Sequence, residues 1–408
     1  MEDKYLLQLV TDLGYEMLCC GSEIYRVEET VKRICQAYGY EQAEVFAIPS
    51  TIIVSITHQD ETITKSRRLA GKTTDLTKLA KLNELSRQLC ASTPDYQTAR
   101  KLLSDISRSG MYSLWVMTVL GYGMAALAFA LFFGGGWQDA VWAFPIGVMI
   151  KLVDYFLGKV KANGFVVTVV SGGISALIAV LGVQIGFIDH IGHVLMGAIM
   201  NLVPGLMLTN AMRDIMASDF IAGLMRIAEA VLVGAGIAVG VMVPMSVFEG
   251  MLGESFVPGT ILTCLYAAVG VVAFGIIFNV KGRNLYYAAI GGAIGWLSYL
   301  ATAHLMTTDI LGYFCAACAI SIYSEIFARL KKCPVTVCLV PGLIPLVPGS
   351  GIYRTMQYCV SGQTDLFWQT GLYTLEVAAV IGFAMICVSS LVRMFFIGLG
   401  NRRRRKTA

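Results

Sequence analysis

Long apolar runs alternate with short polar segments along the last three quarters of the chain. Each run is roughly 20 residues long, the length that an α-helix needs to cross a bilayer core of about 30 Å. Dividing the runs at Gly, Pro and polar clusters predicts ten membrane-spanning helices. They cover, roughly, residues 112–133, 138–157, 164–186, 190–209, 219–246, 259–280, 284–305, 308–330, 334–358 and 367–397.

The first 110 residues have a different pattern, in which apolar positions recur at helical or strand spacing among many polar ones. This pattern predicts a small α/β domain. Helices are expected at 4–19, 22–38, 73–92 and 95–108, and strand-like segments at 43–57 and 61–66. The expected fold class is a mainly α membrane protein of about ten transmembrane helices, preceded by this domain. The expected domains are 1–110, 111–250, 251–399 and a basic tail at 400–408.

The distribution of charge separates the same two regions. Residues 1–110 carry 14 Lys/Arg and 15 Asp/Glu, half of the 58 charged residues in the chain of 408. A composition that is 56% hydrophobic, with a mean hydropathy of +0.68, excludes a wholly soluble, fibrous or disordered protein. The net charge of +4 reflects a terminal basic run, 402–406, directly after an apolar segment. We expect this run to anchor at a membrane surface and expect no nucleic-acid partner.

The positions of the basic residues predict the orientation in the membrane. With residues 1–110 in the cytoplasm, every loop that contains Lys or Arg falls on the inner side. The outer loops, including the one around 246–258, contain none. The positive-inside rule therefore predicts that both termini are cytoplasmic. The first twenty residues also lack the basic start and short apolar core of a secretory signal.

A short motif recurs in the two halves of the membrane region. Leu202-Val-Pro-Gly-Leu206 in the fourth predicted span is repeated as Leu339-Val-Pro-Gly-Leu343 in the ninth. A weaker echo relates Ile146-Gly147 and Tyr155 to Ile290-Gly291 and Tyr299. The two motifs predict a duplicated unit of five spans. Because five is odd, the two copies face opposite ways, which is the inverted 5+5 repeat of many secondary transporters.

Proline and glycine are expected to interrupt helices inside the membrane. Proline removes a backbone donor and clashes with the preceding turn, so breaks are predicted at Pro204-Gly205, at Pro341-Gly342 and around Pro345 and Pro348. The exposed ends of half-helices suit a carboxylate substrate. Asn201, Thr209 and Asn210 flank the first break, and we predict substrate binding by Asn201, Pro204, Gly205, Asn210, Pro341 and Gly342. Kinks that serve packing alone are the alternative.

An ionisable side chain inside a predicted span costs about a few kcal/mol to insert into the membrane, so its presence indicates a functional or structural role. Arg226 and Glu229 are three residues apart, on one helical face, and Glu376 has no basic residue one turn away. We assign Arg226 and Arg354 to the substrate carboxylate and Glu229 and Glu376 to proton coupling. A purely structural ion pair is the alternative for Arg226 and Glu229.

Motifs for other chemistry are weak. Gly71-Lys72-Thr73 follows a strand, but the first glycine of a P-loop would fall at Ser66, so no nucleotide site is expected. His190 and His193 lie close together, but not four residues apart, so no metal site and no cofactor are expected.

Several longer motifs resemble the threonine/serine exporter family (ThrE-like). Its first part resembles Gly21-Ser-Glu-Ile-Tyr-Arg-Val-Glu28, Thr74-Asp-Leu76 through Asn83-Glu-Leu85, and Asn201 to Gly205 with Asn210 to Asp214. Its second part resembles Leu339 to Gly351 with Tyr353-Arg354. The resemblance covers essentially the whole chain, with both parts fused. It implies a bacterial cytoplasmic-membrane exporter, driven by the proton gradient, for threonine, serine or succinate-like dicarboxylates.

The sequence thus predicts a transporter and not an enzyme. The expected partners are a small-molecule substrate, protons and the lipid bilayer, and whether the chain forms a homo-oligomer stays open. Two other classes remain as alternatives. A passive channel would conduct without a gradient, and a membrane-anchored enzyme or regulator would act through residues 1–110.

Overall fold

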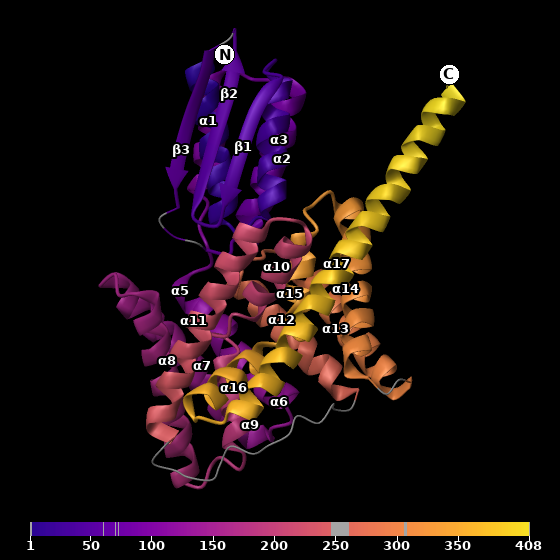
Figure 1. Cartoon of the computed structure of the whole chain (residues 1–408). Coiled ribbons are helices and arrows are strands. Elements are labelled where there is room, and N and C mark those ends of the chain that lie inside the picture. The colour runs from indigo at the N-terminus through magenta and orange to yellow at the C-terminus, as the bar shows by residue number, and fades with distance from the viewer. Residues whose placement is uncertain are drawn as a thin grey trace. The chain divides into compact units, whose positions relative to one another are not determined.

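The computed structural model describes residues 2–59, 61–69, 71, 73–245, 261–305 and 308–407, and the chain divides into two compact units (Figure 1). The first unit contains Met1–Tyr112 together with Phe278–Lys281, and the second contains Ser113–Ile277 and Gly282–Ala408. The short segment at 278–281 was not part of the predicted first domain. The predicted outer loop at 246–258 and the predicted boundary at residue 250 lie outside the described residues.

The first unit is a three-stranded antiparallel sheet with helices packed on it (Figure 1). Its elements are α1 (Asp3–Cys19), α2 (Ile24–Ala37), β1 (Gln42–Ile48), β2 (Thr51–His58), β3 (Glu61–Arg68), α3 (Leu76–Ser92) and α4 (Tyr96–Ser107). The predicted strand-like segment 43–57 is two strands, because Pro49 and Ser50 form a tight turn that pairs Ile48 with Thr51. In β2, Ile52, Val54 and Ile56 are completely buried, as alternation predicts for a half-buried strand.

Charged residues of the family motif hold this unit together. Glu23 is 2.9 Å from the guanidinium of Arg26, and the Glu28 carboxylate accepts a hydrogen bond from the backbone N–H of Ala47 in β1. Segment 278–281 is tied to the same unit: the backbone carbonyl of Asn279 accepts from Thr77, and its side chain accepts from the N–H of Tyr112. These motif residues therefore have structural partners inside the first unit.

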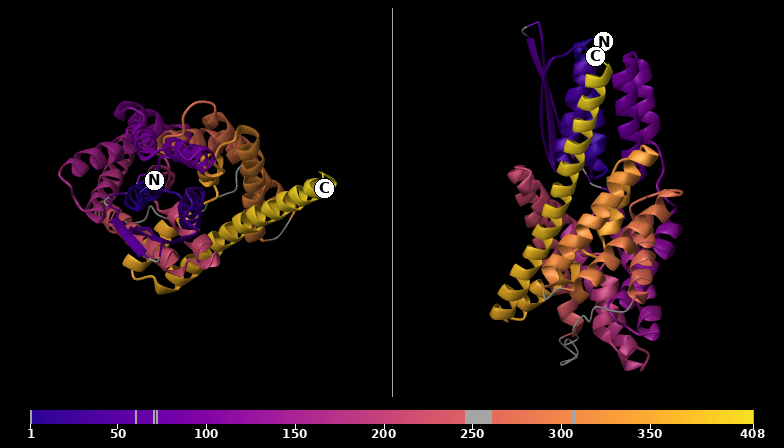
Figure 2. Two further views of the ribbon diagram at one scale, coloured as in Figure 1. Left: turned by 90° about the horizontal axis from the view of Figure 1, so that it is seen from above. Right: turned by 90° about the vertical axis from the view of Figure 1, so that its right-hand side faces the viewer.

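The second unit is a bundle of helices. Its first half contains α5 (Leu114–Val116), the π-helix η1 (Met117–Gly123), α6 (Met124–Phe132), α7 (Trp137–Lys159), α8 (Gly164–Gln184), α9 (Ile191–Ile199), α10 (Gly205–Met216) and α11 (Phe220–Met245). Its second half contains α12 (Leu262–Ile277), α13 (Asn284–Leu305), α14 (Asp309–Lys331), α15 (Thr336–Leu343), α16 (Gly349–Val360) and α17 (Thr364–Thr407). Figure 2 shows that α17 extends far past the other helices of its unit.

Within the described residues, six stretches of helix are long and apolar enough to cross a membrane, which indicates a multi-pass membrane protein. They are Leu114–Phe132, Trp137–Lys159, Gly164–Gln184, Phe220–Met245, Asp309–Lys331 and Thr364–Phe395. The expected count of ten spans stays a prediction, partly because α9, α10, α15 and α16 are short helices of eight to twelve residues.

Glycines allow the helix backbones of this unit to approach closely. A Cβ at Gly147 of α7 would overlap the carbonyl oxygen of Tyr122, and one at Gly197 of α9 would lie 2.5 Å from the backbone nitrogen of Ala130. Small residues at such positions are typical of membrane helix interfaces, where close van der Waals contact stabilises the bundle.

The structure has two helix interruptions, and the position of the second differs in part from the prediction. In the first, α9 ends at Ile199 and α10 begins at Gly205, directly after Pro204, as expected. In the second, Pro341 and Gly342 lie inside α15, and α16 begins at Gly349 after Pro348. The prediction of a break at Pro341-Gly342 is therefore wrong. A third copy of the motif, Leu346-Val-Pro-Gly349, lies at the second break. Its glycine is the first residue of α16, just as Gly205 of 202–205 is the first residue of α10.

We predict that Gly147→Ala lowers the thermal unfolding temperature of the purified protein in detergent, because the new methyl group overlaps the η1 backbone. Overpacking of this kind typically costs about 1–3 kcal/mol. Gly158→Ala, in the same helix but with no atom near its added methyl group, is the matched control and should not lower it. Equal melting temperatures for the two variants would contradict the close packing at Gly147.

Candidate functional site

The two helix interruptions touch each other through a reciprocal contact. A Cβ at Gly205 would overlap Val347 Cγ1, and a Cβ at Gly349 would lie 2.9 Å from Val203 Cγ1. Each valine stands two residues before the glycine of its own half and packs on the glycine of the other half. We call residues 200–205 and 346–349 the crossing. Only glycine allows the two backbones to approach this closely.

The crossing brings two helix amino ends close together. α10 begins after Pro204 and α16 after Pro348, and neither proline has a side-chain group that could cap the helix. The first N–H groups of a helix have no partner within it, and the helix dipole adds about half a positive charge there. Such ends form a natural anion site. A carboxylate is therefore a fitting ligand for the crossing.

Asn201 lies in the first interruption and is held by its side chain. Its Nδ2 donates to the carbonyl oxygen of Tyr122 at 3.1 Å and to that of Ala198 at 3.3 Å. Tyr122 belongs to η1, and π-helical turns often occur at functional sites. Among the described residues, the buried Oδ1 of Asn201 has no hydrogen-bond partner. The side chain thus has an acceptor to offer to a ligand.

Arg354 reaches from α16 to the first half of the other interrupted helix. Its guanidinium contacts the sulfur of Met196 at 3.4 Å, and Met200, which directly follows α9, faces Gly349. A thioether is a weak hydrogen-bond acceptor. Arg354 therefore brings a positive charge beside the crossing, as the sequence analysis expected for a carboxylate-binding residue.

A buried group of charges lies farther along α10. Arg226 Nε is 2.9 Å from Asp214 Oδ2, and an Arg213 nitrogen is 4.0 Å from Asp214 Oδ1. The side chain of Asp214 is only 4% exposed and that of Arg226 only 17%. Asp214 is nine residues from Gly205, or about 14 Å along the helix. Arg226 thus has an acidic partner on α10 that the sequence analysis did not assign to it.

The remaining predicted site residues are spread over the unit. Gly342 packs against Ile320 of α14 and the backbone of Gly292 of α13, away from the crossing. Asn210 is half-buried on α10, and Glu229 is half-buried three residues after Arg226. Glu376 is exposed on α17. The structure brings Asn201, Pro204, Gly205 and Arg354 to the crossing, but not Pro341, Gly342 or Glu376.

Three further polar residues lie near these features, of which the sequence analysis named Thr209 beside the first break but did not propose Lys151 or Tyr353 as site residues. The side chain of Lys151 is 15% exposed, and its ammonium nitrogen lies 5.2 Å from the centre of the Tyr122 ring and 2.6 Å from Asp154. Thr209 and Tyr353 are buried, and among the described residues their hydroxyl oxygens have no hydrogen-bond partner. Thr209 follows Gly205 by four residues and Tyr353 follows Gly349 by four residues. This equal spacing, about one helical turn, is the sequence signal that connects them to the two breaks.

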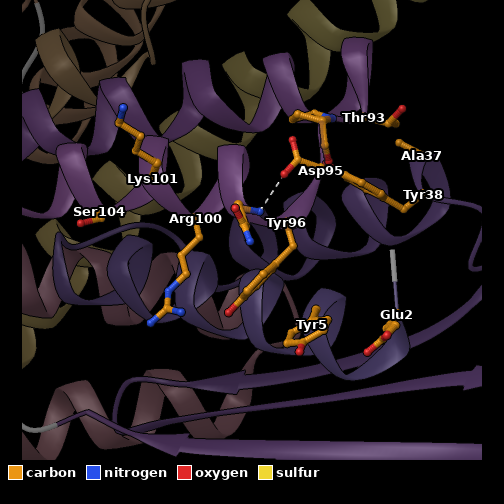
Figure 3. A pocket seen from close by; sticks show the side chains of 12 residues that line it. Glu2, Tyr5, Ala37, Tyr38, Thr93, Asp95, Tyr96, Arg100, Lys101 and Ser104 are labelled. Carbon is orange, nitrogen blue, oxygen red and sulfur yellow. Dashed lines mark hydrogen bonds between the residues drawn. The ribbon is translucent and has the colours of Figure 1, made fainter.

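A hollow with a volume of about 1180 Å³ lies in the first unit. Figure 3 shows Tyr5, Tyr38, Asp95, Tyr96 and Arg100 among the side chains around it. These groups already have partners. The ring centres of Tyr5 and Tyr96 are 4.7 Å apart, Tyr38 donates to the Pro94 carbonyl, and Asp95 caps α4. Hydrogen bonding to Thr98 lowers the pKa of Asp95. The hollow therefore shows no arrangement that favours a particular ligand.

In the described part of the second unit, one group of side chains could hold a metal ion. Asp139 of α7 lies beside His190 and His193, with one ligand atom of each within 4.8 Å of the others. The sequence analysis compared the two histidines with each other only, and their spacing argued against a metal site. Asp139, some fifty residues earlier, could not be connected to them from the sequence.

Two family models together cover most of the chain. "Putative threonine/serine exporter" matches residues 8–248, and "Threonine/Serine exporter, ThrE" matches residues 263–391. A "Probable threonine/serine exporter" of Mycobacterium tuberculosis is 24% identical, covering 87% of this chain and 70% of that protein. The "Threonine/serine exporter" of Corynebacterium glutamicum is also 24% identical, with 88% and 76% covered.

A further relative aligns with a smaller share of the chain. The "Probable succinate transporter subunit YjjP" of Klebsiella aerogenes is 24% identical, covering 60% of this chain and 95% of that protein. No solved structure matches. These relatives are named as transporters, not enzymes. With its first family model spanning more than half of its length, the chain belongs to the threonine/serine exporter family.

Proposed function

We propose that this protein is a secondary active transporter that exports small hydrophilic carboxylates, most closely threonine and serine, using the proton gradient. The observation that carries the proposal is the crossing, where two interrupted helices present their amino ends side by side. Membership of the exporter family and the names of the relatives support the substrate class.

The substrate carboxylate is proposed to bind at the crossing. The amino ends of α10 and α16 supply backbone N–H groups, and Arg354 supplies a full charge. Asn201 Oδ1 accepts a hydrogen bond from the substrate ammonium or hydroxyl group. Broken helices that meet near the bilayer midplane are the usual binding site of transporters built from inverted repeats.

An inverted repeat is proposed because packing in the two halves corresponds helix by helix. Helices α7 to α11 correspond in order to α13 to α17. The contact of α8 with α11 corresponds to that of α14 with α17, and the contact of α7 with α9 to that of α13 with α15. The contact of α10 with α17 likewise corresponds to that of α16 with α11. One offset relates both motifs: Ile146 corresponds to Ile290 and Leu202 to Leu346, each 144 residues later. Alternating access would then exchange the conformations of the two halves.

Proton coupling is proposed to use the charged group on α10 and α11. Arg213 and Arg226 face Asp214, and Glu229 stands one turn after Arg226. With Glu229 ionised, these four charges sum to zero. With Glu229 protonated they leave one positive charge, so the proton changes the net charge of the group by one. Because export driven by an inward proton gradient exchanges substrate for protons, protonation of Glu229 is proposed to accompany substrate release and its deprotonation to accompany substrate binding. Glu376 is retained as the alternative proton carrier.

The protein is proposed to lie in the bacterial cytoplasmic membrane with both termini in the cytoplasm. The absence of Lys and Arg from the predicted outer loops supports this orientation. A dicarboxylate is the second substrate candidate, because a relative named as a probable succinate transporter subunit aligns with 60% of the chain.

We predict gradient-dependent efflux from proteoliposomes that contain the purified protein and radiolabelled threonine, serine or succinate. Threonine or serine should leave faster when a proton gradient is imposed, and protein-free liposomes are the control. Preferential efflux of succinate would support the dicarboxylate alternative. Equal efflux with and without the gradient would indicate a passive channel and contradict the proposal.

We predict that Arg354→Ala reduces threonine efflux by roughly tenfold to a hundredfold at equal membrane abundance. A hydrogen bond to a charged group contributes about 1.5–3 kcal/mol, which corresponds to that range. Arg329→Ala is the matched control, because Arg329 is a surface residue of α14 beside Glu325. If both variants transport like the unmodified protein, the carboxylate does not bind at Arg354.

We predict that Glu229→Gln abolishes the response of efflux to the proton gradient while gradient-free substrate exchange continues. Glutamine keeps the size of the side chain but cannot carry the exchangeable proton. Glu376→Gln, on the exposed face of α17, is measured beside it. Loss of coupling in Glu376→Gln alone would assign the proton to Glu376 and refute the role of Glu229.

A further inference from the structure

Asp139, His190 and His193 form a cluster at the start of two helices. Asp139 is in the first turn of α7, His190 directly precedes α9, and His193 is in the first turn of α9. Asp139 is completely buried, His193 is 8% exposed, and the side chain of His190 is 49% exposed. The cluster therefore combines a buried carboxylate with two imidazoles and is open to solvent on the His190 side.

The polypeptide fixes the position of the carboxylate. Asp139 Oδ1 accepts from the N–H groups of Asp189 and His190, at 3.1 and 3.2 Å. Its Oδ2 accepts from the N–H of Gly136 at 2.9 Å and lies 3.2 Å from His190 Nδ1. The backbone groups that hold Oδ1 would act as the outer shell of a metal site, in which ligands are oriented by hydrogen bonds.

Close packing around Gly135 brings His193 to the same place. A Cβ at Gly135 would lie 2.9 Å from the Ala130 carbonyl oxygen, 3.1 Å from His193 Cβ and 3.3 Å from Asp139 Cβ. The rings of His190 and His193 are 5.4 Å apart, centre to centre. One ligand atom from each of the three side chains lies within 4.8 Å of the other two.

The fold does not require this cluster. The positions 144 residues after Asp139, His190 and His193 are Arg283, Pro334 and Val337, none of which could replace them as a set of metal ligands. The second half of the unit nevertheless forms the corresponding helices. The three side chains are therefore a local addition to the first half.

We propose that Asp139, His190 and His193 bind a single Zn²⁺ ion. Two imidazole nitrogens and one carboxylate oxygen are a ligand set typical of zinc, with a fourth position left for water. The 3.2 Å between Asp139 Oδ2 and His190 Nδ1 is close to the ligand separation in a tetrahedral site. Mg²⁺ and Ca²⁺ prefer oxygen ligands only and fit the two imidazoles poorly. The ion would join the start of α7 to the start of α9.

The test is calorimetric titration of ZnCl₂ into the full-length protein in detergent, purified with an affinity tag that contains no histidine. We expect saturable binding of one Zn²⁺ per chain. His193→Ala and Asp139→Asn should each weaken it by about tenfold or more, since changes even to outer-shell partners cost 10- to 100-fold. His304→Ala, at an exposed histidine outside the cluster, should bind as the unmodified protein does.

Two further measurements keep the test decisive. His190 is half-exposed, so His190→Ala serves if a buried variant fails to fold, and it should weaken binding similarly. Cobalt in place of zinc should give the intense visible absorption of a tetrahedral site, and the histidine variants should lose it. No saturable binding, or equal binding by all cluster variants, would overturn the proposal. The second result would place the zinc at side chains outside the cluster.

Discussion

The contact between the two glycines and the two valines of the crossing constrains the rest of the membrane unit. Gly205 and Gly349 allow two backbones to touch, so α9, α10, α15 and α16 must stop and start at this point. A side chain at either glycine would separate them. The long helices then pack around the interruptions, with α11 against α16 and α17 against α10. The amino ends of α10 and α16 therefore meet because of packing at two residues.

Several charged side chains lie inside the second unit, and each has a different kind of partner. Asp214 has Arg226 and Arg213 beside it, Lys151 has Asp154 and the ring of Tyr122, and Arg354 has the sulfur of Met196. Isolated charges in a low-dielectric interior are costly, so such partners are needed for insertion.

The first unit shows how a family motif can serve structure and not chemistry. Glu23 and Arg26, which belong to the motif that carries the resemblance, pair with each other, and Glu28 binds the backbone of β1. Asp75 caps α3 by accepting from the N–H of Lys78. The transport proposal consequently rests on the second unit.

The sequence by itself determined the membrane character, the small α/β unit, the break at Pro204-Gly205 and the family, because apolar run length and proline act locally. It did not determine which Val-Pro-Gly copy forms the second break. Those at 339–342 and 346–349 are identical, and only packing of Gly349 on Val203 distinguishes them. The partners Asp214 for Arg226 and Asp139 for the two histidines also depended on tertiary structure. They come from different helices, and such proximity has no local signature.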